Sequence, residues 1–163
     1  MSTSFNSVYD LFLNEIEADA SFVDYVNLSE RESLELAMSR CKNLLIESIS
    51  ELTSKCTPDV NFLDYDVELE ILNVDLTINE KKLLSTIMFK NYMGRDIPKL
   101  KTFVLNYIPS EMTVFSPANE RNSYMALMKD LELRVNVAID KYASRDRLTG
   151  KRKSIDFSSY TEE

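Results

Sequence analysis

The stretch "FSPANERNSYMALMKDLELRVNVAIDKY", residues 115–142, predicts one long amphipathic helix. Ser116 suits an N-cap, and Pro117 suits the first helical position, where its missing N–H costs nothing. Apolar residues then recur at helical spacing, and these are Tyr124, Leu127, Met128, Leu131, Val135, Ala138, Ile139 and Tyr142. At a rise of 1.5 Å per residue the helix would be roughly 40 Å long. We therefore expect it to extend beyond its own helical bundle.

Three further helices are expected before this one. Apolar residues at three- and four-residue spacing predict a first helix over residues 5–17. Ser29 and Glu32 have the spacing of a capping box and predict the start of a second helix, which ends before Pro58. The expected buried stripe of this second helix consists of Leu34, Ala37, Cys41, Leu44, Leu45, Ile49 and Leu52.

A third helix is expected to begin at a second capping box. Thr77 and Glu80 supply that box, and Gly94 is expected to be the first residue beyond the helix end. Two prolines interrupt the connector that follows, over residues 95–115, and its length favours a short helix around residues 100–107.

The segment between the second and third helices has a different period. Val67, Leu69 and Ile71 alternate with acidic residues, which predicts a short strand or extended arm near residues 64–72. No second convincing strand is present in the sequence, so we expect this segment to pair with the C-terminal tail or with a neighbouring subunit. An extended loop packed on the helices is the alternative.

The predicted fold is therefore mainly α, with about four helices in a bundle. The last of these helices is the long C-terminal one. The predicted fold also contains one short extended element and an extended C-terminal tail. We divide the chain into a helical domain over residues 1–143 and a basic, polar tail over residues 144–163.

Composition argues against an enzyme. The chain of 163 residues has no histidine and only two glycines, which excludes histidine-based nucleophilic machinery and phosphate-cradling glycine loops. The acidic residues at positions 64, 66, 68 and 70 could face a hard cation, but neither EF-hand spacing nor a turn glycine accompanies them. We predict no catalytic residue, no metal, no cofactor and no small-molecule substrate.

Charge is distributed unequally along the chain. The net charge is −8, yet residues 1–80 hold 17 acidic and 4 basic side chains, while residues 81–163 hold 10 acidic and 15 basic ones. Complementary ends of this kind can attract copies or partners. No apolar run is long enough to cross a bilayer and no leader pattern opens the chain, so we expect a soluble protein made in a cytoplasm, with no membrane contact.

The last twenty residues combine positive charge with spaced apolar residues. The basic side chains are Arg145, Arg147, Lys151, Arg152 and Lys153, and the apolar ones that follow are Ile155, Phe157 and Tyr160. This pattern fits a docking tail that leaves the long helix, binds a partner and is mobile until it does so. A disordered end is the alternative. Removal of residues 144–163 is expected to leave the stability of the helical domain nearly unchanged.

Two segments resemble the head-to-tail connector (adaptor, or head-completion) proteins of tailed bacteriophages. They are "LTINEKKLLSTIMFKNYM" and "FSPANERNSYMALMKDLELRVNVAIDKYA", separated by the proline-interrupted connector. The residues that match the family pattern are Ser116, Ala118, Asn119, Leu127, Leu131 and Tyr142, and the similarity covers roughly residues 62–145. Relatives often have a tryptophan at the end of the penultimate helix, where this chain has Phe89 and Tyr92.

The resemblance implies a structural virion protein located in the neck, between capsid and tail, and synthesised in the host bacterial cytoplasm. Its implied partners are the portal protein, neighbouring copies in a ring of twelve, and a downstream stopper or tail protein. The implied ring extends the DNA channel, and non-specific contact with channel DNA is expected at most. A soluble helical protein-interaction or regulatory module, phage-encoded or not, is the alternative function.

Overall fold

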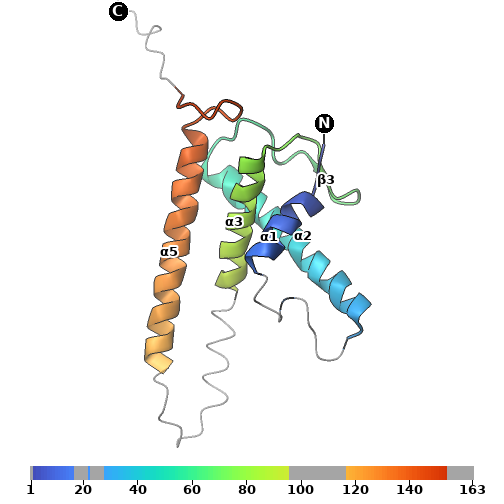
Figure 1. The fold of residues 1–163 in the computed structure, drawn as a ribbon, viewed down its shortest axis with the longest axis vertical. Coiled ribbons are helices and arrows are strands. Elements are labelled where there is room, and N and C mark those ends of the chain that lie inside the picture. The colour runs from blue at the N-terminus through green and yellow to red at the C-terminus, as the bar shows by residue number, and fades with distance from the viewer. Residues whose placement is uncertain (1, 17–21, 23–27, 96–116, 154–163) are drawn as a thin grey trace, which may run out of the picture.

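The computed structural model describes residues 2–16, 22, 28–95 and 117–153 (Figure 1). The helices are α1 (Asn6–Glu15), α2 (Glu30–Lys55), α3 (Ile78–Gly94) and α5 (Pro117–Ala143), and the strands are β1 (Thr3–Ser4), β2 (Tyr65–Asp66) and β3 (Ile71–Leu72). The fold is thus mainly α with a short extended element, as the sequence predicts. The predicted N-cap Ser116, and the short helix expected around residues 100–107, lie outside the described residues.

Both predicted capping boxes are present and begin the helices where expected. The Ser29 backbone N–H donates to Glu32 Oε2 at 2.9 Å, and the Glu32 backbone N–H returns a bond to Ser29 Oγ. Thr77 and Glu80 make the same reciprocal pair at the start of α3. Each box satisfies backbone donors that a helix start would otherwise leave without partners.

The end of α3 differs from the prediction. Gly94 lies inside the helix, and the C-cap is Arg95, whose φ of −74° is right-handed. The only glycine with positive φ in the described part of the chain is Gly150. The left-handed conformation that favours glycine after a helix end is therefore not used here.

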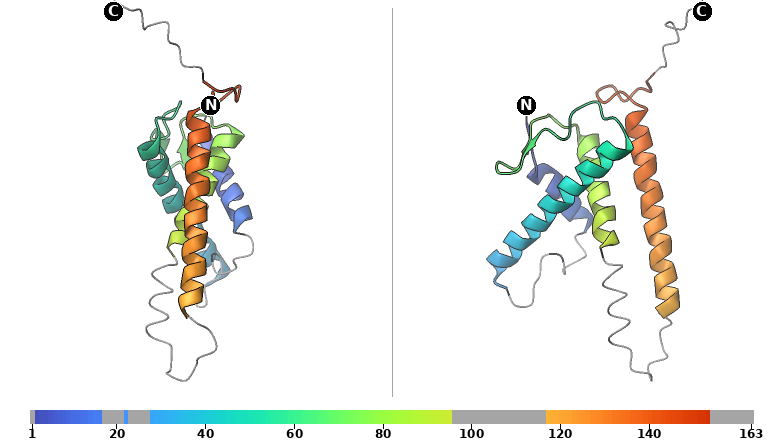
Figure 2. Two further views of the ribbon diagram at one scale, coloured as in Figure 1. Left: turned by 90° about the vertical axis from the view of Figure 1, so that its left-hand side faces the viewer. Right: turned by 180° about the vertical axis from the view of Figure 1, so that it is seen from behind.

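Helix α3 occupies the centre of the fold. It packs against α1, α2 and α5, and α5 runs antiparallel beside it (Figures 1 and 2). Because it has neighbours on several sides, α3 is apolar around much of its circumference. Its buried residues are Glu80, Leu83, Leu84, Ser85, Ile87, Met88 and Tyr92.

The core combines aliphatic and aromatic side chains from all four helices. The rings of Phe12, Phe22 and Tyr92 contact one another edge to face, with centroids 5.3 to 6.1 Å apart. From α2, the predicted buried residues Ala37, Cys41, Leu44, Leu45, Ile49 and Leu52 are buried. Leu34 was predicted with them but is 56% exposed, because the first turns of α2 project away from the other helices (Figure 1).

The extended segment is a hairpin and not a single strand. Strand β3 pairs antiparallel with β2 and, on its other edge, with β1 at the N-terminus. The expected pairing with the tail or a neighbouring subunit is therefore wrong for β3, since both of its edges are occupied within the chain. The Asp66 side chain accepts bonds from the backbone N–H groups of Glu68 and Leu69, which turns the chain.

This turn separates the three apolar residues that the sequence placed on one face. Val67 and Leu69 lie in the turn and are exposed, whereas Ile71 lies in β3 and is half-buried. Glu70 adopts a left-handed φ of 53° at the point where the chain enters β3. The alternation of apolar and acidic residues predicts one continuous strand, which the structure does not contain. An aspartate side chain can accept hydrogen bonds from backbone N–H groups two and three residues later, and these bonds favour a turn over a strand.

Candidate interaction surface

After α5 the chain folds back on itself in a short hairpin. We call residues 144–153 the C-terminal hairpin. The backbone N–H of Asp146 donates to the Lys151 carbonyl at 2.8 Å, and that of Lys153 donates to the Ser144 carbonyl at 2.9 Å. The Asp146 carboxylate accepts bonds from two backbone N–H groups of the turn, and Gly150 supplies the left-handed conformation that closes it, at φ 68°.

A bidentate ion pair fixes this hairpin to the start of α3. Arg147 Nε donates to Glu80 Oε1 and Arg147 Nη2 donates to Glu80 Oε2, both at 2.9 Å. The same Nη2 also donates to the Asp75 carbonyl at 2.6 Å, and the Tyr142 hydroxyl reaches Glu80 Oε1 at 3.3 Å. The planar guanidinium matches two carboxylate oxygens at once, so the pair specifies orientation as well as attraction.

Glu80 is buried and ionised in this arrangement. Its side chain is 1% exposed, whereas that of Arg147 is 20% exposed. Burial by itself would raise the pKa of Glu80, but hydrogen bonds from Arg147 and Thr77 outweigh it and hold the pKa below the ordinary value. Burial and the charge of Glu80 in turn raise the pKa of the Tyr142 phenol. Arg147 therefore stabilises the ionised form of the buried Glu80 carboxylate.

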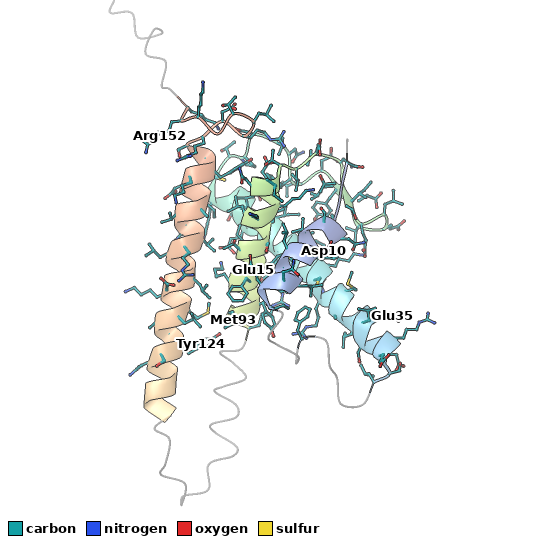
Figure 3. The ribbon with its side chains drawn as sticks, in the orientation of Figure 1. Asp10, Glu15, Glu35, Met93, Tyr124 and Arg152 are labelled. Carbon is teal, nitrogen blue, oxygen red and sulfur yellow. The ribbon has the colours of Figure 1, made fainter. Side chains whose placement is uncertain are left out.

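The expectation that the tail leaves the body is wrong for residues 144–153. Residues 144–153 do not leave the body, because Arg147 pairs with Glu80 and Lys153 Nζ pairs with Asp59 Oδ1 at 2.6 Å. Of the other predicted docking residues, Arg145, Lys151 and Arg152 are exposed in the hairpin, and Figure 3 shows the position of Arg152. Ile155, Phe157 and Tyr160 lie outside the described residues. Partner binding by any of these eight residues stays a prediction.

A second polar junction holds α5 against the body. Glu51 on α2 pairs with Lys55 at 2.8 Å and with Lys90 on α3, and Lys55 also donates to Asn136 on α5 at 3.0 Å. The largely buried Glu51 carboxylate thus joins α2 to α3, and Lys55 links this pair to α5. Nearer the start of α5, the Tyr124 hydroxyl donates to the backbone carbonyl of Met93, at the far end of α3 (Figure 3).

A groove lies between α3, α5 and the C-terminal hairpin. We call it the α3–α5 groove, and its volume is about 450 Å³. Its lining residues are Thr77, Asn79, Lys82, Leu83, Thr86, Ala138, Lys141, Tyr142, Arg145, Asp146, Arg147 and Gly150. Lys82, Lys141 and Arg145 are exposed and form no ion pair with any described residue. Basic side chains therefore outnumber the acidic one, Asp146, in the lining of the groove, which also has an apolar portion.

Several apolar side chains of α5 are exposed. The predicted stripe is partly confirmed, since Leu131, Val135 and Ile139 are buried while Leu127 is not. The exposed apolar residues of this helix are Met125, Leu127, Leu133 and Val137. Leu133 and Val137 lie on the face opposite the buried stripe, whereas Met125 and Leu127 flank that stripe on its two sides.

The acidic residues near the β2–β3 turn have other uses than metal binding. Asp64 accepts from the Asn73 side-chain amide at 2.8 Å, Asp66 caps the turn, and Glu70 pairs with Lys42 at 2.9 Å. Among the described residues no group of three or more histidine, cysteine or acidic side chains could hold a metal ion. In that same part of the chain, no helix is both long and apolar enough to cross a membrane.

Sequence reasoning missed the Glu80–Arg147 pair, because 67 residues separate its members. The local pattern indicates only a capping box for Glu80 and only a basic run for Arg147. Comparison with known proteins gives no match to a family model, to a curated protein or to a solved structure.

Proposed function

We propose that this chain is a structural virion protein of a tailed phage, acting as a subunit of the head-to-tail connector ring. In this role it docks to the portal protein, extends the DNA channel and provides the platform for the next neck or tail protein. Neighbouring copies in a ring of twelve are its lateral partners. The family resemblance of residues 62–145 is the origin of this proposal.

One structural observation supports it most directly. Helix α5 spans 27 residues and is fixed to the body in its C-terminal half, where Leu131, Val135 and Ile139 are buried. Exposed apolar residues occur nearer its start, at Met125 and Leu127, and also on its outer side, at Leu133 and Val137. A rigid helix with apolar residues beyond the fold's own core suits a subunit whose remaining contacts are made by neighbours.

The basic C-terminal hairpin gives the subunit a charged end. Arg145, Lys151 and Arg152 are exposed there, and they would attract an acidic portal surface or, less specifically, channel DNA. Attraction of this kind weakens as salt rises, because exposed charges are screened over about 8 Å at physiological ionic strength.

The test is assembly on portal-bearing heads. Purified protein is mixed with heads that carry the portal but lack the connector, and bound protein is measured by sedimentation and by electron microscopy of the neck. We expect saturable binding and a closed ring beneath the portal. Protein that stays unbound at saturating concentration, while the heads bind an authentic connector, would overturn the proposal in favour of a soluble interaction module.

A further inference from the structure

The α3–α5 groove has the size and chemistry of a docking site for a short acidic, apolar segment. Its volume of about 450 Å³ falls in the range typical of binding pockets. Leu83, Ala138 and Tyr142 provide apolar surface, and the cationic Lys82, Lys141 and Arg145 line the same groove with one acidic residue, Asp146. A partner with a protruding apolar side chain beside a carboxylate would satisfy both parts of the groove.

The β2–β3 turn of this same chain has those properties. Leu69 in the turn is 68% exposed, and Val67, two residues earlier, is also exposed. Glu68 lies between them in the sequence and is exposed as well. Glu68 forms no ion pair with any described residue, so its charge is available to a partner.

The turn is also held in a defined shape. Asp66 accepts from two of its backbone N–H groups, Glu70 pairs with Lys42 on α2, and the Glu70 carbonyl accepts from the Phe5 backbone N–H at 2.9 Å. A preorganised turn loses little conformational entropy when it binds, which favours a specific contact over a small area.

Groove and turn lie on opposite sides of the molecule. The β2–β3 turn is on the side of the body away from α5, whereas α5 and the C-terminal hairpin form the groove wall (Figures 1 and 2). One copy therefore cannot fill its own groove with its own turn, but it can fill that of the next copy. A contact between two different surfaces of one chain repeats head to tail, which generates a ring when the rotation closes.

We propose that the β2–β3 turn of one copy docks in the α3–α5 groove of the next copy, with Leu69 against the apolar surface and Glu68 facing Lys82 and Lys141. The inference rests on the proposed function, because it names the lateral contact of the ring. It assigns the negative charge of the N-terminal half and the positive charge of the C-terminal half to the two sides of one interface.

Zero-length cross-linking tests this contact in the full chain. A carbodiimide joins a carboxylate to a lysine amine only when the two touch, so equal amounts of ¹⁵N-labelled and unlabelled protein are cross-linked, both concentrated in solution and assembled on heads. We expect mixed-label peptides that join Glu68 to Lys82 or Lys141. If mixed-label peptides instead join the C-terminal carboxylates to these lysines, the tail of a neighbour fills the groove and the proposal falls.

Charge exchange provides the matched control. Glu68→Lys should lower the yield of rings by about tenfold, because like charges then face each other. Combining Glu68→Lys with Lys141→Glu should restore ring yield, whereas Glu35→Lys at the exposed start of α2 should leave it unchanged. Normal rings with Glu68→Lys alone would overturn the contact and leave the connector proposal intact. Head-to-tail oligomers that form in solution but never bind heads would support the contact and overturn the connector proposal.

Discussion

Replacement of Arg147 by alanine is expected to destabilise the whole fold, although the residue lies beyond the last helix. The change leaves the Glu80 carboxylate, which is 1% exposed, without its only cationic partner in the described part of the chain. Loss of one partner of a buried ion pair costs about 3–5 kcal/mol. The lower end applies here, since Arg147 is itself 20% exposed and Glu80 keeps its bond from the Thr77 N–H.

A loss of about 3 kcal/mol corresponds to a fall in Tm of roughly 6 to 12 °C for a chain of this length. Urea denaturation followed by circular dichroism measures the free energy of unfolding directly. Arg145→Ala is the matched control, because Arg145 is an exposed arginine of the same hairpin with no ion-pair partner among the described residues. Its effect should stay within about 0.5 kcal/mol.

The pH dependence gives an independent check on the same pair. Glu80 has a pKa below the ordinary value of 4.5 in the folded protein, so its contribution is fully present above pH 4.5. That contribution is lost as the pH falls through the folded pKa, because the unfolded chain then binds the proton more readily. The stability difference between the wild type and Arg147→Ala should therefore be largest at neutral pH and shrink in acid.

Two results would refute this reasoning. One is an Arg147→Ala protein no less stable than Arg145→Ala. The other is a double-mutant cycle with Glu80→Gln that gives no coupling between positions 80 and 147, where contacting residues ordinarily give about 0.5–3 kcal/mol. The same reasoning reverses the expectation for removal of residues 144–163, which should destabilise the protein by at least as much as Arg147→Ala. Removal of residues 154–163 alone retains Arg147 and Lys153, so it should not cause this loss.

Three further predictions concern local features. Gly150→Ala should cost about 1–2 kcal/mol in urea denaturation because φ is 68° there, and a neutral result would mean that the hairpin does not fold with the body. Leu44→Ala should cost about 2–5 kcal/mol and Leu34→Ala almost nothing, since only the first is buried; equal losses in thermal denaturation would contradict the position of α2. Burial raises the pKa of the Cys41 thiol to about 12, so a thiol reagent at pH 8 should modify the half-buried Cys56 first. Mass spectrometry identifies the modified cysteine, and preferential modification of Cys41 would contradict its burial.

Features encoded within a few residues could be predicted from the sequence. The two capping boxes each join residues three positions apart, so the starts of α2 and α3 can be predicted without any tertiary contact. Helical spacing likewise predicted α5, whose 27 residues match the expected length. The end of α3 lies beyond the predicted position, with Arg95 as the C-cap, because glycine is permitted after a helix without being required there.

Burial at the helix ends required the positions of the other elements. Leu34 continues the apolar stripe of α2 without interruption, yet it is exposed because α2 projects beyond the helices that cover the rest of the stripe. The period of a sequence indicates which face of a helix is apolar. It does not indicate how far the neighbouring helices extend along that face.

The sequence by itself determined a mainly α chain, the residue at which each of two helices begins, and one long C-terminal helix. Tertiary structure alone decided that the basic residues after α5 form part of the fold, that β3 pairs with the N-terminus, and that Glu80 serves both a capping box and an ion pair. The physical reason is the range of the interactions. Capping and helical periodicity act over three or four residues along the chain, whereas the Arg147–Glu80 pair exists only where the end of α5 and the start of α3 meet in space.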